Sequence, residues 1–129
     1  MVAVDTNIIV RLLTRDDESQ YQKSVEIFQG YNVFIPDTVI LEVEWVLRFS
    51  YKFKPIEICE ALRNLFGLPN VSVKNPNLLI QVLKWHEFGL DFADALHLGT
   101  SKNYDEFYTF DDKLIKKAKG LTSCQVKQP

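Results

Sequence analysis

The sequence predicts an α/β fold in which a mainly parallel sheet of roughly five strands is covered by helices on both faces. Five short apolar runs, typical of buried strands, alternate with longer segments that have helical spacing. Helical connections of this length are what parallel strands require. At 129 residues, with 47% hydrophobic and 25% charged residues, the chain has the size and composition of one globular domain over residues 1–129.

The first quarter of the chain supplies one strand and two helices. Residues 2–4 are an apolar run, too short to show a period but suited to a buried strand. The next helix covers residues 7–14, where four apolar residues share one side. Asp16 or Asp17 is placed to cap a second helix, which extends to Gly30.

The next quarter supplies a strand and two further helices. The strand at residues 33–35 stops at a proline, which cannot donate to a sheet. Asp37 then caps a helix that continues to about Phe49. Pro55 suits the first position of the following helix, which ends near Gly67.

The second half repeats the alternation of strands and helices. Apolar runs predict strands, helical spacing predicts the segments between them, and a lysine-rich stretch that begins at Asp111 predicts the last helix. The expected elements are a strand at 71–73, helices at 76–88 and 92–102, a strand at 107–110, the lysine-rich helix and a strand at 124–126.

Composition excludes several functional classes. The net charge of −2 does not fit a protein that binds nucleic acid through its overall positive charge. No secretory signal and no apolar run of membrane-spanning length is visible, so we expect a cytoplasmic protein without a membrane partner. Cys59 and Cys124 are isolated, which favours idle thiols in a reducing compartment over a zinc site or a disulfide.

Two aspartates directly follow predicted strands. Asp5 comes after the first strand and Asp111 after the fourth, so parallel strands would bring both to the same edge of the sheet, where α/β folds bind ligands. Carboxylates gathered there repel each other, and Mg²⁺ or Mn²⁺ relieves that repulsion through oxygen ligands. The alternative is that each aspartate only caps the helix that follows it.

Two glutamates interrupt the apolar helix at residues 37–49. Glu44 has Arg48 one turn later, which predicts an ordinary surface ion pair. Glu42 has no cation one turn away on either side, and a carboxylate on a buried helix is costly unless it is paired or binds a metal. We therefore expect a functional role for Glu42 and none for Glu44.

Another acidic pair opens the helix at residues 92–102. Asp91 and Asp94 are three residues apart and therefore share one helix face. Asp91 could instead be the N-cap of this helix, and Asp94 could be a first-turn carboxylate whose negative charge the helix dipole stabilises. His97 follows one turn later, and we interpret it as a packing residue rather than a catalytic one.

Four short segments contain these acidic residues and run through nearly the whole chain. Together, in this order and at this spacing, they resemble the PIN-domain nucleases, and more closely the VapC-type toxins of toxin–antitoxin modules. The segments are VDTN at 4–7, LEVEWVL at 41–47, GLDFADALH at 89–97 and TFD at 109–111.

The resemblance implies a metal-dependent endoribonuclease that hydrolyses RNA phosphodiester bonds with Mg²⁺ or Mn²⁺. It also implies a homodimer and an antitoxin protein as partner. By the family pattern the metal ligands are Asp5, Glu42, Asp94 and Asp111, the catalytic set adds Asp91, and the supporting polar residues are Asn7 and Thr109.

Two other functions fit parts of the sequence. A phosphatase of the HAD type needs an Asp-x-Asp pair after the first strand, and here the second position is Asn7. A non-catalytic PIN-like module that binds RNA or protein would use the carboxylates only as helix caps. Basic residues near two of the acidic segments could guide RNA or could be solvated helix faces: Arg11, Arg15, Lys113, Lys116, Lys117 and Lys119.

Overall fold

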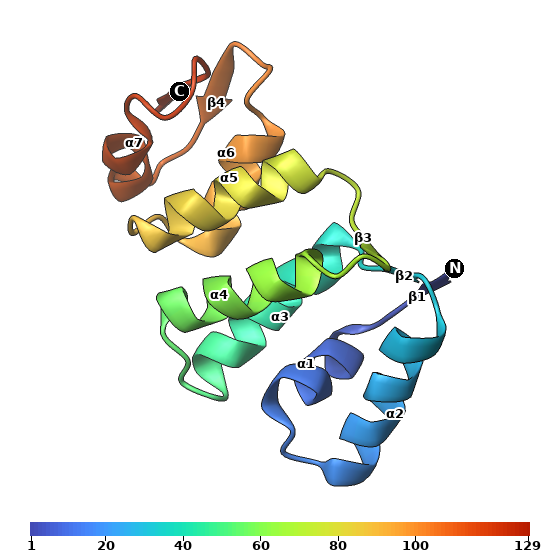
Figure 1. Ribbon diagram of the computed structural model, residues 1–129. Helices are drawn as coiled ribbons and strands as arrows, with labels where there is room; N and C mark the ends of the chain where they lie inside the picture. Colours follow the sequence, from blue (N-terminus) through green and yellow to red (C-terminus); the bar gives the residue numbers. More distant parts are fainter. The chain divides into compact units, whose positions relative to one another are not determined.

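The computed structural model describes residues 1–129 as two compact units (Figure 1). The N-terminal unit is Met1–Pro76 and the C-terminal unit is Asn77–Pro129. Each has its own strands, helices and buried side chains.

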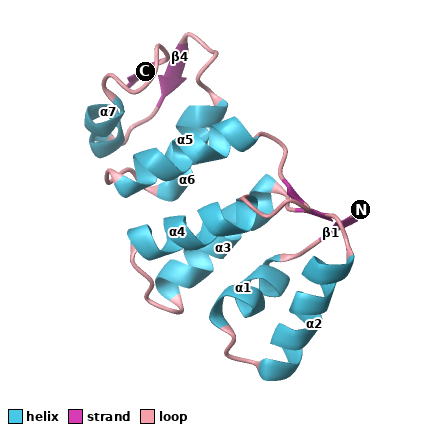
Figure 2. Ribbon diagram, viewed as in Figure 1, coloured by secondary structure: helices cyan, strands magenta, loops and turns pink.

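The N-terminal unit contains a three-stranded parallel sheet in the order β1-β2-β3, whose short strands are magenta in Figure 2. β1 is Val2–Ala3, β2 is Val33–Phe34 and β3 is Val71–Ser72. The central strand β2 pairs on both sides, with Val33 opposite Val2 and Val71. Its Val33 is fully buried, as expected for the middle strand of a covered sheet.

Four helices connect these strands. α1 (Thr6–Thr14) and α2 (Glu18–Gly30) lie between β1 and β2 in the chain, and α3 (Asp37–Phe49) and α4 (Pro55–Phe66) lie between β2 and β3. Such helix pairs are the long crossovers that parallel strands need. Apolar side chains from α1, α3 and α4 are fully buried, among them Ile9, Ile40, Leu47, Ile58 and Leu62.

Most helix starts in this unit follow their predicted caps. The Asp17 side chain accepts a hydrogen bond from the backbone N–H of Gln20 at 3.0 Å, and Pro55 is the first residue of α4. The predicted cap of α3 is wrong. Pro36 occupies the N-cap position with extended backbone (ψ 147°), so Asp37 is already the first helical residue. Its charge there still suits the positive end of the helix dipole.

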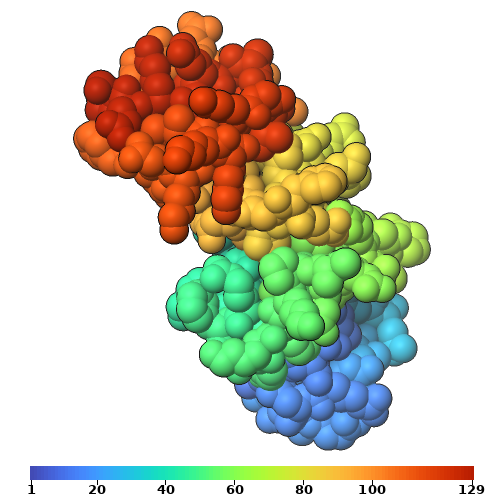
Figure 3. Space-filling model, turned by 90° about the vertical axis from the view of Figure 1, so that its left-hand side faces the viewer, coloured from blue at the N-terminus to red at the C-terminus, as the bar shows by residue number.

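The C-terminal unit holds a helix pair and a two-stranded sheet. α5 (Pro76–Glu87) begins at the unit boundary and is followed by α6 (Phe92–Thr100). The remaining elements are β4 (Glu106–Tyr108), α7 (Asp112–Ala118) and β5 (Gln125–Lys127), and β4 and β5 pair in parallel. Side chains fill the spaces between the ribbons of each unit (Figure 3).

A glycine allows α5 and α6 to pack closely. A Cβ atom added to Gly99 of α6 would come within 2.5 Å of Leu78 Cδ1 and 3.3 Å of Val82 Cγ2 on α5. A second glycine shapes the turn between the two helices, because Gly89 has a φ of +109°, which L-residues rarely adopt. That turn leads directly to Asp91.

The α/β fold class is confirmed, and all five predicted strands are present in parallel pairs. Their hydrogen bonds form one sheet of three strands and one of two, so a single five-stranded sheet is not confirmed. The strands are only two or three residues long, which limits each to a few ladder hydrogen bonds. Both cysteines are buried, and neither forms a disulfide. No helix is long and apolar enough to cross a membrane.

Candidate active site

In the N-terminal unit the two acidic candidates are connected through one threonine. Asp5 follows β1 and caps α1, with its Oδ1 accepting a hydrogen bond from the backbone N–H of Thr6 at 2.7 Å. The buried Thr6 hydroxyl donates a hydrogen bond to Oε1 of Glu42 on α3. Asp5 and Glu42, far apart in the sequence, therefore each bond to the same residue, Thr6.

The predicted environments of the two α3 glutamates are wrong. Glu42 is exposed, whereas Glu44 is only 1% exposed. Arg48 Nε donates to Glu44 Oε2 at 2.7 Å, and the guanidinium also covers the ring of Phe49 at 4.6 Å. The ion pair predicted for Glu44 exists, but it is largely buried, and Glu42 faces solvent with a hydroxyl partner.

The burial of Glu44 has a simple geometric cause. The buried residues of α3 are Ile40, Val43, Glu44 and Leu47, which are spaced as one helical stripe. Glu44 is one turn after Ile40 and therefore belongs to that stripe. Glu42 falls outside it, which leaves its carboxylate accessible to a ligand.

In the C-terminal unit Asp91 and Asp94 lie together at the start of α6. Asp91 is the N-cap, and its Oδ2 accepts a hydrogen bond from the backbone N–H of Asp94 at 3.2 Å. Asp91 is exposed and Asp94 is half-buried. The cap role considered for Asp91 is therefore real, and it is compatible with a second role, since a cap occupies only part of a carboxylate.

Asp111 is likewise the N-cap of its helix, α7, and its side chain is exposed. Its Oδ1 accepts hydrogen bonds from the backbone N–H groups of Lys113 at 2.9 Å and Leu114 at 3.2 Å. The backbone N–H of Asp111 in turn donates to Thr109 Oγ1 at 3.0 Å. Thr109 thus holds the turn that carries Asp111, which fits the supporting position predicted for it.

The three aspartates of the C-terminal unit interact electrostatically. The pKa of Asp94 is raised above the ordinary 3.8, first by burial and then by the negative charges of Asp91 and Asp111. His97 and Lys117 act in the opposite direction without cancelling the rise. The charge on Asp94 is therefore under-compensated by the side chains around it.

The basic residues differ in how far they are already engaged. Arg11 pairs with Asp16 at 3.1 Å and Arg15 with Glu18 at 2.9 Å, so both guanidinium charges are already paired with carboxylates. On α7 the lysines are exposed, and Lys117 Nζ donates to the Gly89 carbonyl at 2.8 Å. Among these candidate basic residues, the charges that are not paired with a carboxylate thus lie on α7 and at its C-cap, Lys119.

The donor chemistry fits a hard divalent cation, although no group of three or more acidic, histidine or cysteine side chains is close enough to form a metal centre by itself. The candidates are all carboxylates, which are preferred ligands of Mg²⁺ and Mn²⁺. Burial raises the pKa of Asp94 most and the charges of Asp91 and Asp111 raise it further, and a bound cation would relieve that repulsion. Mg²⁺ needs few protein ligands, since it keeps several waters.

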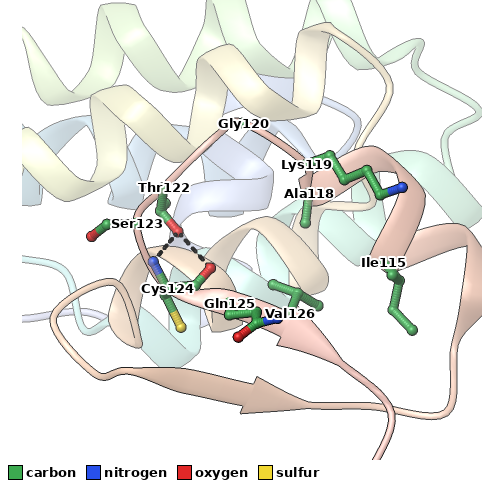
Figure 4. Close-up of a pocket in the computed structure, with 9 residues that line it drawn as sticks. All are labelled: Ile115, Ala118, Lys119, Gly120, Thr122, Ser123, Cys124, Gln125 and Val126. Carbon is green, nitrogen blue, oxygen red and sulfur yellow. Dashed lines mark hydrogen bonds between the residues drawn. The ribbon is translucent and has the colours of Figure 1, made fainter.

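A pocket lies elsewhere in the C-terminal unit. It has a volume of about 370 Å³ and is lined by the end of α7, the following loop and β5 (Figure 4). Thr122 Oγ1 braces the loop, accepting from the Cys124 N–H at 3.1 Å. No acidic candidate lines the pocket, which adjoins the end of α7 opposite to Asp111.

Parallel strands that lead into capping aspartates define a class of α/β proteins with an acidic site at strand ends. Within that class, the PIN domain family matches residues 2–120, so this chain belongs to the PIN domain family. The match covers every acidic candidate and spans both units.

One solved structure and the curated proteins complete the comparison. The chain is similar to VapC20 of Mycobacterium tuberculosis, described as a Sarcin-Ricin loop cleaving toxin, with 18% identity and a TM-score of 0.46. The alignment covers 97% of this chain and 99% of that one. No curated protein matches the sequence significantly.

Sequence reasoning missed Thr6, the residue that joins the two N-terminal acids. Its hydroxyl is buried, and buried hydroxyls need a partner. The signal was present in the apolar residues after it, which predict that α1 packs inward. A buried threonine beside Asp5 on such a helix is a candidate to hold a second side chain. Asn7, predicted to support the site, is exposed in the first turn of α1.

Proposed function

We propose that this protein is a Mg²⁺- or Mn²⁺-dependent endoribonuclease that hydrolyses RNA phosphodiester bonds, and that it is the toxin of a VapBC-type toxin–antitoxin pair. One observation carries the proposal. In a chain of the PIN domain family, carboxylates follow β1 and β4, and other carboxylates lie beside them on α3 and α6. Carboxylates in such places suit cation-assisted phosphate chemistry.

The cation would be held by Asp5, Glu42, Asp94 and Asp111, with Asp91 as a further catalytic residue. When bound, it supplies an acidified water as nucleophile and neutralises charge on the phosphoryl oxygens. Thr6 fixes the Glu42 carboxylate by donating to Oε1, and Thr109 fixes the turn of Asp111. Each of the five acids is a possible proton acceptor for the attacking water.

The proposed biological setting follows from the resemblance to VapC toxins. We propose one domain over residues 1–129, acting in the cytoplasm as a homodimer that an antitoxin protein inhibits. The chain offers exposed apolar side chains that a protein partner would cover. On α3, Trp45 and Phe49 are 53% and 49% exposed, with ring centroids 5.0 Å apart.

The alternative is a non-catalytic PIN-like module that binds RNA or protein. The observation in its favour is that Asp5, Asp91 and Asp111 all serve as helix caps. Caps alone explain neither the exposed Glu42 nor the raised pKa of Asp94. A HAD-type phosphatase is less suitable, since Asn7 stands where its second aspartate is required.

The substitution Glu42→Gln separates catalysis from binding. It keeps the shape and the hydrogen bond from Thr6 but removes a charge, so we expect RNA cleavage in Mg²⁺ to fall by about 100-fold or more. The matched control is Glu60→Gln, an exposed glutamate on α4 of the same unit, which should cleave normally. Equal cleavage by both variants would reject the proposed role of Glu42.

A further inference from the structure

Two strongly exposed phenylalanines flank the acidic cluster of the C-terminal unit. Phe88 is 90% exposed in the turn between α5 and α6, three residues before Asp91. Phe110 is 81% exposed and directly precedes Asp111. By contrast, Phe92 in the same unit is fully buried, so the unit has an ordered apolar interior from which these two rings are excluded.

The turns that carry the two phenylalanines are held next to each other. Lys117 on α7 donates to the carbonyl of Gly89, the residue after Phe88, at 2.8 Å. Asp111, the residue after Phe110, caps the same helix α7. Both turns also lead into aspartates that raise the pKa of Asp94. The two turns, and not the exposed rings themselves, are therefore held beside one acidic cluster.

The surroundings of the rings do not resemble a surface for another protein. Phe88 lies between exposed Glu87 and Gly89, and Phe110 lies between half-buried Thr109 and exposed Asp111. A protein interface has an apolar core from which charged residues are depleted. Here, single aromatic faces stand among charged and polar groups, with the exposed lysines of α7 nearby.

Aromatic faces combined with positive charge suit single-stranded nucleic acid. Unpaired bases stack on aromatic side chains, while lysines meet the phosphates between them. In a duplex the base faces are already covered by their neighbours, so exposed rings offer little to double-stranded RNA.

We propose that Phe88 and Phe110 are stacking platforms for bases of single-stranded RNA that flank the phosphate at the acidic cluster. This proposal rests on the proposed ribonuclease function and specifies its substrate class. The rings bind the bases, Lys113 and Lys117 face the backbone charge, and the aspartates stay with the cation. The site therefore selects unpaired RNA before any chemistry occurs.

The test measures binding of a fluorescent 12-nucleotide oligoadenosine RNA to the full chain. All proteins carry Asp94→Asn so that the RNA stays intact, and Mg²⁺ is present throughout. Phe88→Ala and Phe110→Ala should each weaken binding by about 5- to 150-fold, the range for loss of one stacked base. Phe110→Trp should retain the affinity, and its fluorescence should be quenched by the RNA.

Two controls isolate stacking from charge and from folding. Tyr104→Ala removes an aromatic side chain that is 71% exposed and precedes β4, at the end of the strand opposite to Phe110, and should bind normally. An oligomer with the same backbone but abasic sites should bind weakly and equally to all variants. Removal of exposed side chains leaves the fold intact, which thermal unfolding checks.

The outcomes separate this proposal from the proposed function. If the unsubstituted chain cleaves RNA but the two alanine variants bind oligoadenosine as tightly as the parent, stacking is overturned and the ribonuclease stands. A loss of self-association, with RNA binding unchanged, would make the rings a protein-docking surface and would also overturn stacking. If the unsubstituted chain neither binds nor cleaves RNA, the proposed function itself fails.

Discussion

The two acidic regions are stabilised in different ways. In the N-terminal unit, Asp5 and Glu42 are connected by hydrogen bonds through Thr6. In the C-terminal unit, burial raises the pKa of Asp94, and the like charges of Asp91 and Asp111 raise it further. The first region is therefore held in place without a cation, whereas the second carries repulsion that a cation would relieve. Hydrogen bonds therefore position the acidic pair of the N-terminal unit, whereas charge interactions characterise the aspartates of the C-terminal unit.

The largest expected effect comes from removing charge in the C-terminal unit. Asp94→Asn should reduce RNA cleavage by about 100-fold or more, because it removes a cation ligand. The same change removes repulsion, so the free energy of unfolding should not fall. Single-turnover cleavage and urea unfolding measure the two quantities on one protein.

The matched control for that change is Asp112→Asn. Asp112 is an exposed neighbour on α7 whose side chain accepts a hydrogen bond from Gln128 at 2.8 Å, and it belongs to no acidic pair proposed above. Cleavage by this variant should stay close to that of the unsubstituted chain. An equal loss in both variants would mean that general negative charge, rather than Asp94, is what cleavage requires.

A smaller effect is expected from disturbing geometry in the N-terminal unit. Thr6→Val keeps the side-chain shape but removes the hydroxyl that holds Glu42. The Mn²⁺ affinity should fall by about 10- to 100-fold, as is typical when a residue that orients a metal ligand is lost. Isothermal titration measures it, with Thr14→Val on the same helix as control, since Thr14 bonds only to Val10 and Asp16. Unchanged affinity would show that Glu42 needs no such support.

The buried ion pair on α3 should affect stability and not activity. Arg48→Met should lower the free energy of unfolding by about 2 kcal/mol, the scale of hydrogen bonds to a charged group. Arg15→Met, which breaks the exposed pair with Glu18, should lower the free energy of unfolding by less than Arg48→Met does. Urea unfolding compares the two. A marked loss of cleavage in a folded Arg48→Met protein would place Glu44 in the site after all.

The smallest expected effect is a pH dependence of stability, which tests the raised pKa of Asp94. The folded-state pKa of Asp94 lies above the ordinary 3.8, so in the interval between these values the folded protein binds more protons than the unfolded one. Stability from this group is therefore lost as pH rises through that interval. The stability of Asp94→Asn relative to the unsubstituted chain should rise with pH there and then level off. A constant difference would contradict the raised pKa of Asp94.

Much of the fold was predictable because its signals are local. Asp17 and Pro55 mark helix starts by their own backbone chemistry, and the short apolar runs became strands. The cap of α3 was predicted one residue late, because Pro36 takes the N-cap position without a side-chain hydrogen bond. The preference for capping side chains therefore favoured Asp37 instead.

The candidate site was only partly predictable because it depends on which helix face is buried. The α3 helix is apolar on nearly all sides, so periodicity alone did not separate Glu42 from Glu44. The stripe through Ile40, Val43 and Leu47 contains position 44, and this spacing was the available signal. The raised pKa of Asp94 depends on Asp111, which lies on another helix and could not be placed from local sequence.

The most direct test of the central claim is a Mn²⁺ titration of the antitoxin-free chain, followed by amide NMR. We predict that sub-stoichiometric Mn²⁺ selectively broadens the amides around Asp5, Glu42, Asp94 and Asp111, with equal midpoints. The Asp94→Asn variant should lose the broadening at all four positions together. Broadening at other residues, or none at millimolar Mn²⁺, would contradict the metal site and favour carboxylates that serve only as helix caps.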